Sequence, residues 1–135
     1  MATRHQSRAS VITLLYALDL GNDKIDKFAD EILEDKKIRN KQKDFALGLF
    51  SGVKNNLQEI DDIINSQLKE WSVKELGSIE KAILRLGTYE LREKKLDTAI
   101  IINESIELAK SLGGDTAPKF INGVMDSINR SMKPQ

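Results

Sequence analysis

The residues best suited to chemistry are basic and aromatic side chains beside two expected helix starts. Arg4 and Arg8 give the first helix a basic beginning that could bind phosphates through charge and hydrogen bonds. Lys119 and Phe120 follow the loop at residues 113–118, where free amides at a helix start suit an anion and the ring could stack on a base. The structural alternatives are a solvated helix end for the arginines and a core position for Phe120. A nucleic-acid contact at these two groups is therefore a hypothesis.

The chain offers little material for catalysis. It has no cysteine and a single histidine, His5, which excludes thiolate nucleophiles, cysteine zinc sites and most catalytic triads. The neighbouring pairs Glu80–Lys81 and Tyr89–Glu90 point in different directions on a helix, so neither builds an acid–base site. No phosphate-binding loop, dinucleotide fingerprint or metal-ligand spacing is present. We therefore expect no enzymatic activity, no metal and no cofactor.

The composition is typical of one folded domain. The 135 residues are 40% hydrophobic and 31% charged, which is enough apolar side chain to bury a core. The absence of cysteine is typical of a reducing compartment, and the sequence shows neither a signal peptide nor the roughly 18 apolar residues of a membrane span. These features predict a cytoplasmic protein with no membrane contact.

Charge is distributed in blocks along the chain. The net charge is zero, from 21 basic and 21 acidic residues, so any basic surface must be local. Residues 1–18 contain two arginines and one histidine but no acid. Residues 19–35 are strongly acidic, and five basic residues follow within residues 36–43. This order predicts strong local dipoles.

The hydrophobic pattern predicts an all-α fold of about six or seven helices. No alternating strand pattern appears, and both prolines lie near the C-terminus. Ser72 to Glu75 has the spacing of a capping box, Asp97 can cap a helix, and Gly113 and Pro118 can end one helix and begin the next. Apolar residues recur at helical spacing at 11–18, 25–33, 45–68, 79–91, 101–112 and 120–128. The stripe at 45–68 predicts one long helix, either straight or bent, and a new helix is expected from Ser72.

Four stretches taken together closely resemble the NusB family of transcription antitermination factors. The first helix, from Arg4 to Tyr16, also looks like the arginine-led first helix of that family. The four stretches are EKAILR at 80–85, YEL at 89–91, INESIELAK at 102–110 and KFINGVMD at 119–126. Their order and spacing match the family, so the resemblance covers nearly the whole chain.

The resemblance implies both a fold and a function. The fold is a single compact helical RNA-binding domain, 1–135, made of two packed sub-bundles at about 1–70 and 71–135. Family members bind the boxA element of nascent ribosomal RNA together with a small-subunit ribosomal protein known as NusE. They help RNA polymerase, within an antitermination complex, to read through terminators, and they support ribosomal RNA maturation. Homodimers also occur in the family, so a homodimer is an open alternative.

The resemblance also implies roles for individual residues. Arg4 and Arg8 match the family's basic helix start, and Lys119 with Phe120 matches its RNA-contacting lysine and phenylalanine. Thr116 belongs to the same RNA face but stands where the family usually carries an acid.

Tyr16 and Glu80 match positions that face the ribosomal protein. The family's arginine run is diluted here to RHQSR at residues 4–8, which is the second departure from its pattern.

Two other functions occur with a similar helical domain or could use one, and only the second remains open. Similar helical domains begin ribosomal RNA cytosine methyltransferases, but no glycine-rich cofactor-binding domain follows here, so methyl transfer is not expected of this chain. A non-RNA-binding helical adaptor, or a homodimeric scaffold, is the alternative from a different class. Binding of boxA RNA would separate that alternative from the antitermination factor.

Overall fold

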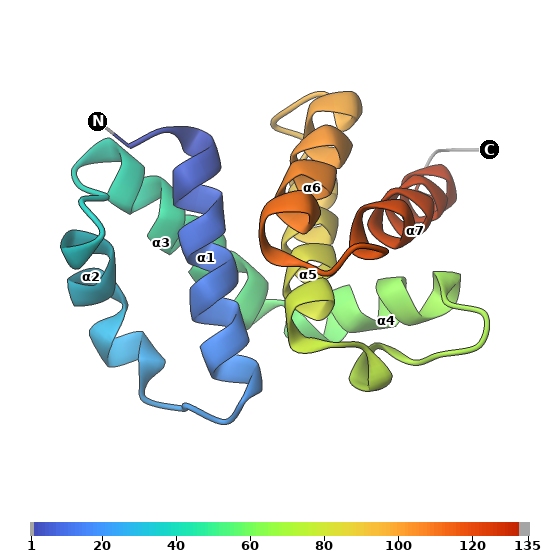
Figure 1. Ribbon diagram of the computed structural model, residues 1–135, viewed down its shortest axis with the longest axis horizontal. Helices are drawn as coiled ribbons and strands as arrows, with labels where there is room; N and C mark the ends of the chain where they lie inside the picture. The colour runs from blue at the N-terminus through green and yellow to red at the C-terminus, as the bar shows by residue number, and fades with distance from the viewer. Residues whose placement is uncertain (1, 133–135) are drawn as a thin grey trace. The chain divides into compact units, whose positions relative to one another are not determined.

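A computed structural model describes residues 2–132, which contain seven α-helices, one short 3-10 helix and no strand (Figure 1). The all-α prediction is therefore confirmed. The elements are α1 (Arg4–Asp19), α2 (Ile25–Asp35), α3 (Lys41–Asn55), α4 (Leu57–Gln67), η1 (Val73–Glu75), α5 (Ser78–Glu93), α6 (Thr98–Leu112) and α7 (Ala117–Ser131).

The helices divide into two compact units, of which the first ends at Asn55 and the second begins at Asn56. This boundary comes earlier than the one expected near residues 70 and 71. The single long helix predicted at 45–68 is wrong, because α3 ends at Asn55 and α4 begins at Leu57. Asparagine competes with the helix through its own side-chain hydrogen bonds, and Asn56 has a non-helical φ of −122°. The stripe continues across this break because α4 buries Ile60 and Ile64 within the second unit.

In the first unit, α1 packs against both α2 and α3. Helix α1 starts with a capping box that was not expected from the sequence: the Gln6 amide donates to Thr3 Oγ1 at 3.0 Å, and the Thr3 amide donates to Gln6 Oε1 at 2.8 Å. The buried apolar residues of α1 are Val11, Ile12, Leu14 and Leu15. The cap and the buried stripe together set where α1 begins and which face it buries.

The acidic and basic blocks of the first unit pair with each other. Lys43 of α3 forms ion pairs with Asp30, at 3.0 Å, and with Glu34 of α2. Arg39 also pairs with Glu34, at 2.9 Å, and Lys54 pairs with Asp26. The hydrogen bond from Lys43 lowers the pKa of Glu34, and the same bond raises the pKa of Lys43. Much of the predicted local dipole is thus neutralised between α2 and α3.

In the second unit, α5 packs against α4, α6 and α7. Its buried apolar residues are Ala82, Ile83, Leu84, Leu86 and Leu91. Arg85 of α5 donates to both carboxylate oxygens of Asp61 of α4, at 2.9 and 2.8 Å, and both side chains are mostly buried. This two-point contact orients α4 on α5 more strictly than an apolar contact would.

The helix boundaries of the second unit largely follow the local signals. Ser72 and Glu75 do form a capping box, but it begins η1, and α5 starts later, after Gly77. Asp97 is the N-cap residue of α6, Gly113 ends α6, and Pro118 lies in the first turn of α7, as predicted. The expected helix start at Ser72 is wrong because this cap is followed by an extended residue, Leu76, with a ψ of 154°.

Two glycines within helices of the second unit have opposite surroundings. A Cβ at Gly87 of α5 would lie 2.6 Å from Met125 Cε and 2.9 Å from Ser105 Oγ. Both contacting residues are buried, so the site has little room to adjust. A Cβ at Gly123 of α7 would meet no described atom within 4 Å. Gly87 therefore allows α6 and α7 to approach α5, whereas Gly123 has no such role.

The two glycines predict opposite results for alanine. Gly123→Ala should raise the free energy of unfolding by about 0.5–1 kcal/mol, because alanine favours the helix. Gly87→Ala gains the same preference but overpacks the contact with Met125 and Ser105, which costs about 1–3 kcal/mol. Urea denaturation followed by circular dichroism should place Gly87→Ala clearly below Gly123→Ala. Equal stability of the two variants would show that α5 and α7 do not pack as described.

Candidate nucleic-acid interface

The two N-terminal arginines share one aromatic ring. Arg4 and Arg8 are one helical turn apart, so they lie on the same face of α1. The guanidinium carbon of Arg4 lies 3.8 Å from the centre of the Phe45 ring, and that of Arg8 lies 5.1 Å from it. Such cation–π contacts contribute about 0.5–1 kcal/mol at exposed sites and more when water is excluded. Phe45 of α3 therefore holds two positive groups near each other.

The two arginines differ in exposure. Arg4 is exposed, so the outer side of its guanidinium is open to a ligand. Arg8 is only 4% exposed, so its role as a direct phosphate contact stays a prediction. The single hydroxyl proton of Ser7, between them, has two acceptors within reach, the Thr3 carbonyl at 2.9 Å and Gln42 Oε1 of α3 at 3.2 Å.

Phe45 is a candidate functional residue that the sequence did not reveal. It was expected to begin the apolar stripe of the third helix, and it is partly exposed. The spacing of Arg4 and Arg8 shows that they share a face, but no local pattern identifies a ring 37 residues after Arg8 as their partner.

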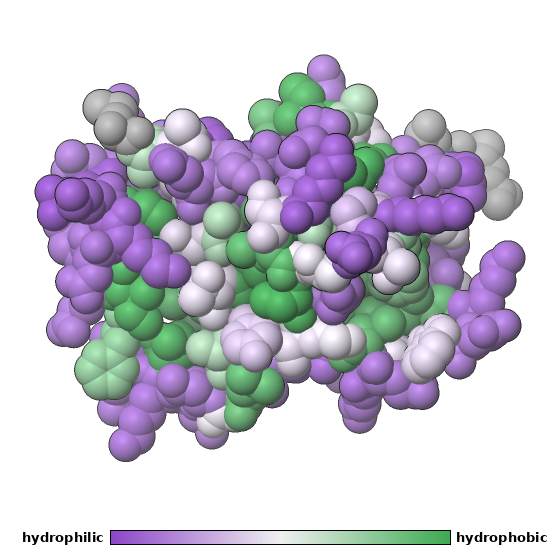
Figure 2. All heavy atoms as spheres, in the orientation of Figure 1, coloured by the Kyte–Doolittle hydropathy of each residue, from purple (hydrophilic) through white to green (hydrophobic). Residues whose placement is uncertain are grey.

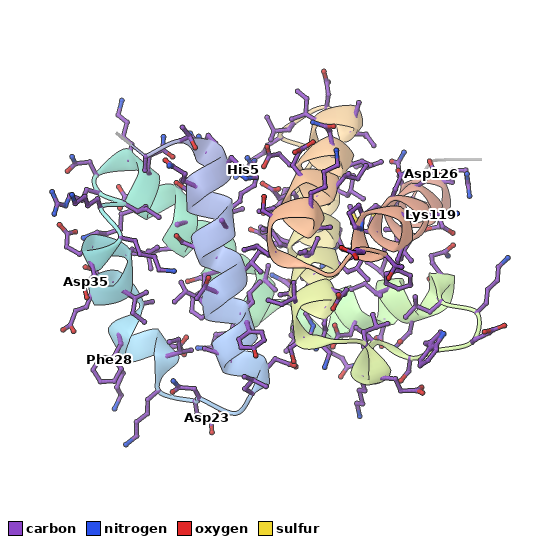
Figure 3. The ribbon with its side chains drawn as sticks, in the orientation of Figure 1. His5, Asp23, Phe28, Asp35, Lys119 and Asp126 are labelled. Atoms are coloured by element: carbon purple, nitrogen blue, oxygen red, sulfur yellow. The ribbon has the colours of Figure 1, made fainter. Side chains whose placement is uncertain are left out.

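The second group of predicted RNA contacts lies at the start of α7. Thr116 is the exposed N-cap residue, and its side chain makes no capping hydrogen bond among the described residues. Its carbonyl accepts the Phe120 amide at 3.2 Å, which places both residues in one turn. Lys119 is exposed and Phe120 is half-buried; Figure 3 shows Lys119 on α7. The positive end of the helix dipole adds to the charge of Lys119.

Gly113 determines how the chain enters this turn. A Cβ at Gly113 would lie 2.7 Å from Ala117 Cβ and 2.9 Å from the Ala109 carbonyl oxygen. The backbone oxygen cannot move without disturbing the end of α6, so only glycine fits here. The close link between α6 and α7 thereby positions Thr116, Lys119 and Phe120.

The two groups of predicted RNA contacts lie in different units. Arg4 and Arg8 are brought together in the first unit, whereas Thr116, Lys119 and Phe120 are brought together in the second. Each group has at least one exposed cation and one aromatic ring. The first group is therefore equipped to contact a phosphate, because its ring already holds the arginines, and the second is equipped to contact a phosphate and a base.

The two predicted protein-contact residues also lie in different units. Tyr16 is near the end of α1 and is 38% exposed, so its ring is available to a partner. Glu80 lies in the first turn of α5 and is half-buried. Its carboxylate lies over Gly77, where a Cβ would be 2.5 Å from Oε2. An acid at this position also stabilises the helix start, so Glu80 has a structural role besides the predicted one.

The surface is mixed in character. Figure 2 shows polar and charged residues over much of one face, with apolar residues between them. Exposed large hydrophobic residues occur in both units, and Figure 3 shows Phe28 pointing away from α2. These residues are Tyr16, Leu20, Phe28, Trp71, Leu96, Ile100 and Leu112.

The pairs that resembled acid–base groups are used structurally. The Tyr89 hydroxyl donates to Glu93 Oε1, one turn later, at 2.7 Å. This bond to a carboxylate raises the pKa of Tyr89 to about 12.

Within residues 2–132 no three His, Asp or Glu side chains gather as a metal site. No helix in the same range is long and apolar enough to cross a bilayer.

The class of protein follows from the fold and these surfaces: a small all-helical factor of two units, with basic and aromatic residues at the starts of α1 and α7. The chain belongs to the NusB family, whose model matches residues 5–130.

Relatives and solved structures match over nearly the full length. The chain is 62% identical over 128 residues to the transcription antitermination protein NusB of Aliarcobacter butzleri, which covers 95% of this chain and 98% of the relative. It is 59% identical over 133 residues to the transcription antitermination protein NusB of Nitratiruptor, and this match covers 98% of this chain and 96% of the relative.

Among solved structures, T. maritima NusB superposes with a TM-score of 0.88 at 34% identity and covers 98% of this chain and 94% of that one. A crystal structure of the antitermination factors NusB and NusE in complex with dsRNA gives a TM-score of 0.86 at 31% identity, covering 95% and 96%.

The hydrogen bond of Tyr89 predicts a late titration. In a Tyr16→Phe protein, Tyr89 is the only tyrosine, and its phenolate absorbance at 295 nm should rise with a midpoint near 12. Glu93→Gln in the same background removes the negative charge and should lower the midpoint toward the ordinary value of 10. Far-UV circular dichroism at each pH checks that the helices persist. Identical midpoints in folded samples would contradict the Tyr89–Glu93 bond.

Proposed function

We propose that the chain is a non-catalytic transcription antitermination factor that binds boxA RNA of nascent ribosomal RNA transcripts together with NusE. In the cytoplasm it would act within the antitermination complex of RNA polymerase and support ribosomal RNA maturation. The observation that carries this proposal is the near full-length likeness to a NusB bound to NusE and RNA, at a TM-score of 0.86. Identities of 59% and 62% to transcription antitermination proteins support it further.

In this proposal, the first unit binds RNA through Arg4. The face of its guanidinium is stacked on Phe45, so the group is held in place and its N–H donors can meet a phosphate at little entropic cost. Arg8 adds positive charge beside the same ring. Phe45 is thus a positioning residue for the arginines. Because the family's arginine run is diluted here to RHQSR, the guanidinium groups of Arg4 and Arg8 are the main positive charges of this segment.

The second unit binds RNA through the start of α7. Lys119 attracts a phosphate, and the half-buried Phe120 offers part of its ring to a base. At position 116 this chain has the neutral Thr116 where the family usually carries an acid. The negative charge that would repel the phosphate is therefore missing here. The two units would then act as one RNA-binding domain, with Tyr16 and Glu80 left for NusE.

The decisive experiment measures RNA binding with and without the ribosomal partner. Fluorescence anisotropy with labelled boxA RNA and a scrambled RNA of equal length should show tighter binding of boxA, and addition of NusE should tighten it further. Equal binding of both RNAs in the presence of NusE would contradict the proposal. Absence of any RNA binding would favour the adaptor alternative.

The RNA face predicts separable effects of charge and ring. Lys119→Gln should lower the slope of log affinity against log salt by about 0.7 for single-stranded RNA, because one phosphate contact is lost. Phe120→Leu should weaken binding by about 1–3 kcal/mol, because leucine packs in place of the ring but cannot stack.

Matched controls are Lys69→Gln, an exposed lysine of the same unit, and Phe28→Leu, an exposed ring of α2. Both controls should bind RNA as the wild type does, and thermal melting should show that all four variants fold. If Phe120→Leu binds boxA with wild-type affinity, Phe120 serves the core alone.

The protein-binding face predicts a charge effect on NusE. Tyr16→Asp and Glu80→Lys should each weaken the NusE complex at least tenfold in isothermal titration calorimetry, since each places a wrong charge in a matched contact. Glu80→Gln keeps the size of the side chain and should weaken it less. Normal NusE affinity in both folded charge variants would show that the partner binds elsewhere.

A further inference from the structure

A hollow of about 450 Å³ lies on the first unit, between the start of α1 and the loop that joins α2 to α3. Gln6, Ser10 and Ala9 line it from α1, and Lys36, Lys37 and Ile38 line it from the loop. Its volume falls in the range of roughly 300–1,000 Å³ that is usual for small-molecule sites. The Arg4–Phe45 contact does not include any of these lining residues.

The hollow carries positive charge that the first unit does not neutralise. Of the basic block at residues 36–43, Arg39 and Lys43 form ion pairs with acids of α2. Lys36 and Lys37 are exposed, and within residues 2–132 neither has an acidic partner. Two exposed lysines that line one hollow attract an anion.

A mostly buried serine also lines the hollow. Ser10 is only 5% exposed and is one of the lining residues. A ligand that accepts a hydrogen bond from the Ser10 hydroxyl gains affinity. Gln6 uses its Oε1 to accept the Thr3 amide, which leaves its NH2 group as a further donor. The hollow thus offers four donor groups and, from Ala9 and Ile38, an apolar wall.

We propose that this hollow binds one nucleotide of single-stranded RNA, with a phosphate between Lys36 and Lys37 and the sugar or base against Ala9 and Ile38. This inference rests on the proposed RNA-binding function and adds a site to it. Gln6 is two residues after Arg4, about 3 Å along the axis of α1. An RNA strand that contacts Arg4 therefore reaches the hollow by passing around the start of α1.

The first test compares two pairs of lysines. The double variant Lys36→Gln/Lys37→Gln should bind boxA RNA roughly three- to tenfold more weakly and lower the log-log salt slope by about 0.7. The control Lys24→Gln/Lys41→Gln makes the same charge change in the same unit, at exposed lysines outside the hollow, and should stay within about twofold of wild type. If the two double variants bind alike, the hollow does not bind RNA.

The second test distinguishes RNA from a free phosphate. Uridine monophosphate and inorganic phosphate are titrated separately while backbone amide resonances are followed by NMR. Uridine monophosphate should shift the amides of Ser10 and Lys37, and Ser10→Ala should reduce these shifts. Shifts with inorganic phosphate, together with RNA affinity that does not depend on Lys36 and Lys37, would show a small-anion site and overturn the RNA assignment.

The outcomes separate this inference from the proposed function. If the wild type binds no RNA, the antitermination function itself fails. If it binds RNA through Lys119 and Phe120 but the lysines of the hollow have no effect, only the further site fails.

Discussion

The cation–π contact of Arg4 and Arg8 with Phe45 is the interaction on which the N-terminal surface depends. A guanidinium on a long flexible side chain loses considerable entropy when it binds a phosphate. In the proposed RNA site, stacking on a ring fixed in α3 would remove part of that cost, because the guanidinium is already held 3.8 Å from the ring centre. The packing of α1 on α3 would then support binding as well as folding.

Ion pairing inside the first unit decides which basic residues are left to act on a partner. Acidic residues of α2 form ion pairs with three of the basic residues, Arg39, Lys43 and Lys54. These ion pairs join α2 to its neighbours. The net charge is zero, so binding of a polyanion must come from the cations that remain. Lys36 and Lys37 are among these cations in the first unit, and they line a hollow together with the mostly buried Ser10. Pairing within the fold thus converts a balanced composition into a local positive surface.

The start of α7 shows how a tight turn prepares a site. Gly113 permits an approach of Ala117 that no larger residue allows, and Pro118 begins the next helix directly. The turn leaves Thr116 and Lys119 exposed and Phe120 half-buried. Because the ring is partly in the core, it contributes to packing, and because it is partly outside, it could stack on a base in the proposed RNA site. The proposal thus assigns Phe120 to both stability and recognition.

The sequence by itself determined the helical class, the approximate place of most helices and the family, and it supplied the residues for which roles are predicted. Helix periodicity and the caps at Asp97, Gly113 and Pro118 are local, so they can be read from neighbouring residues. Tertiary structure alone decided that the stripe at 45–68 breaks at Asn56, that Phe45 stacks with two arginines, and that Lys36 and Lys37 form no ion pair within residues 2–132. These results depend on contacts between residues far apart in the chain, and no short pattern specifies such contacts.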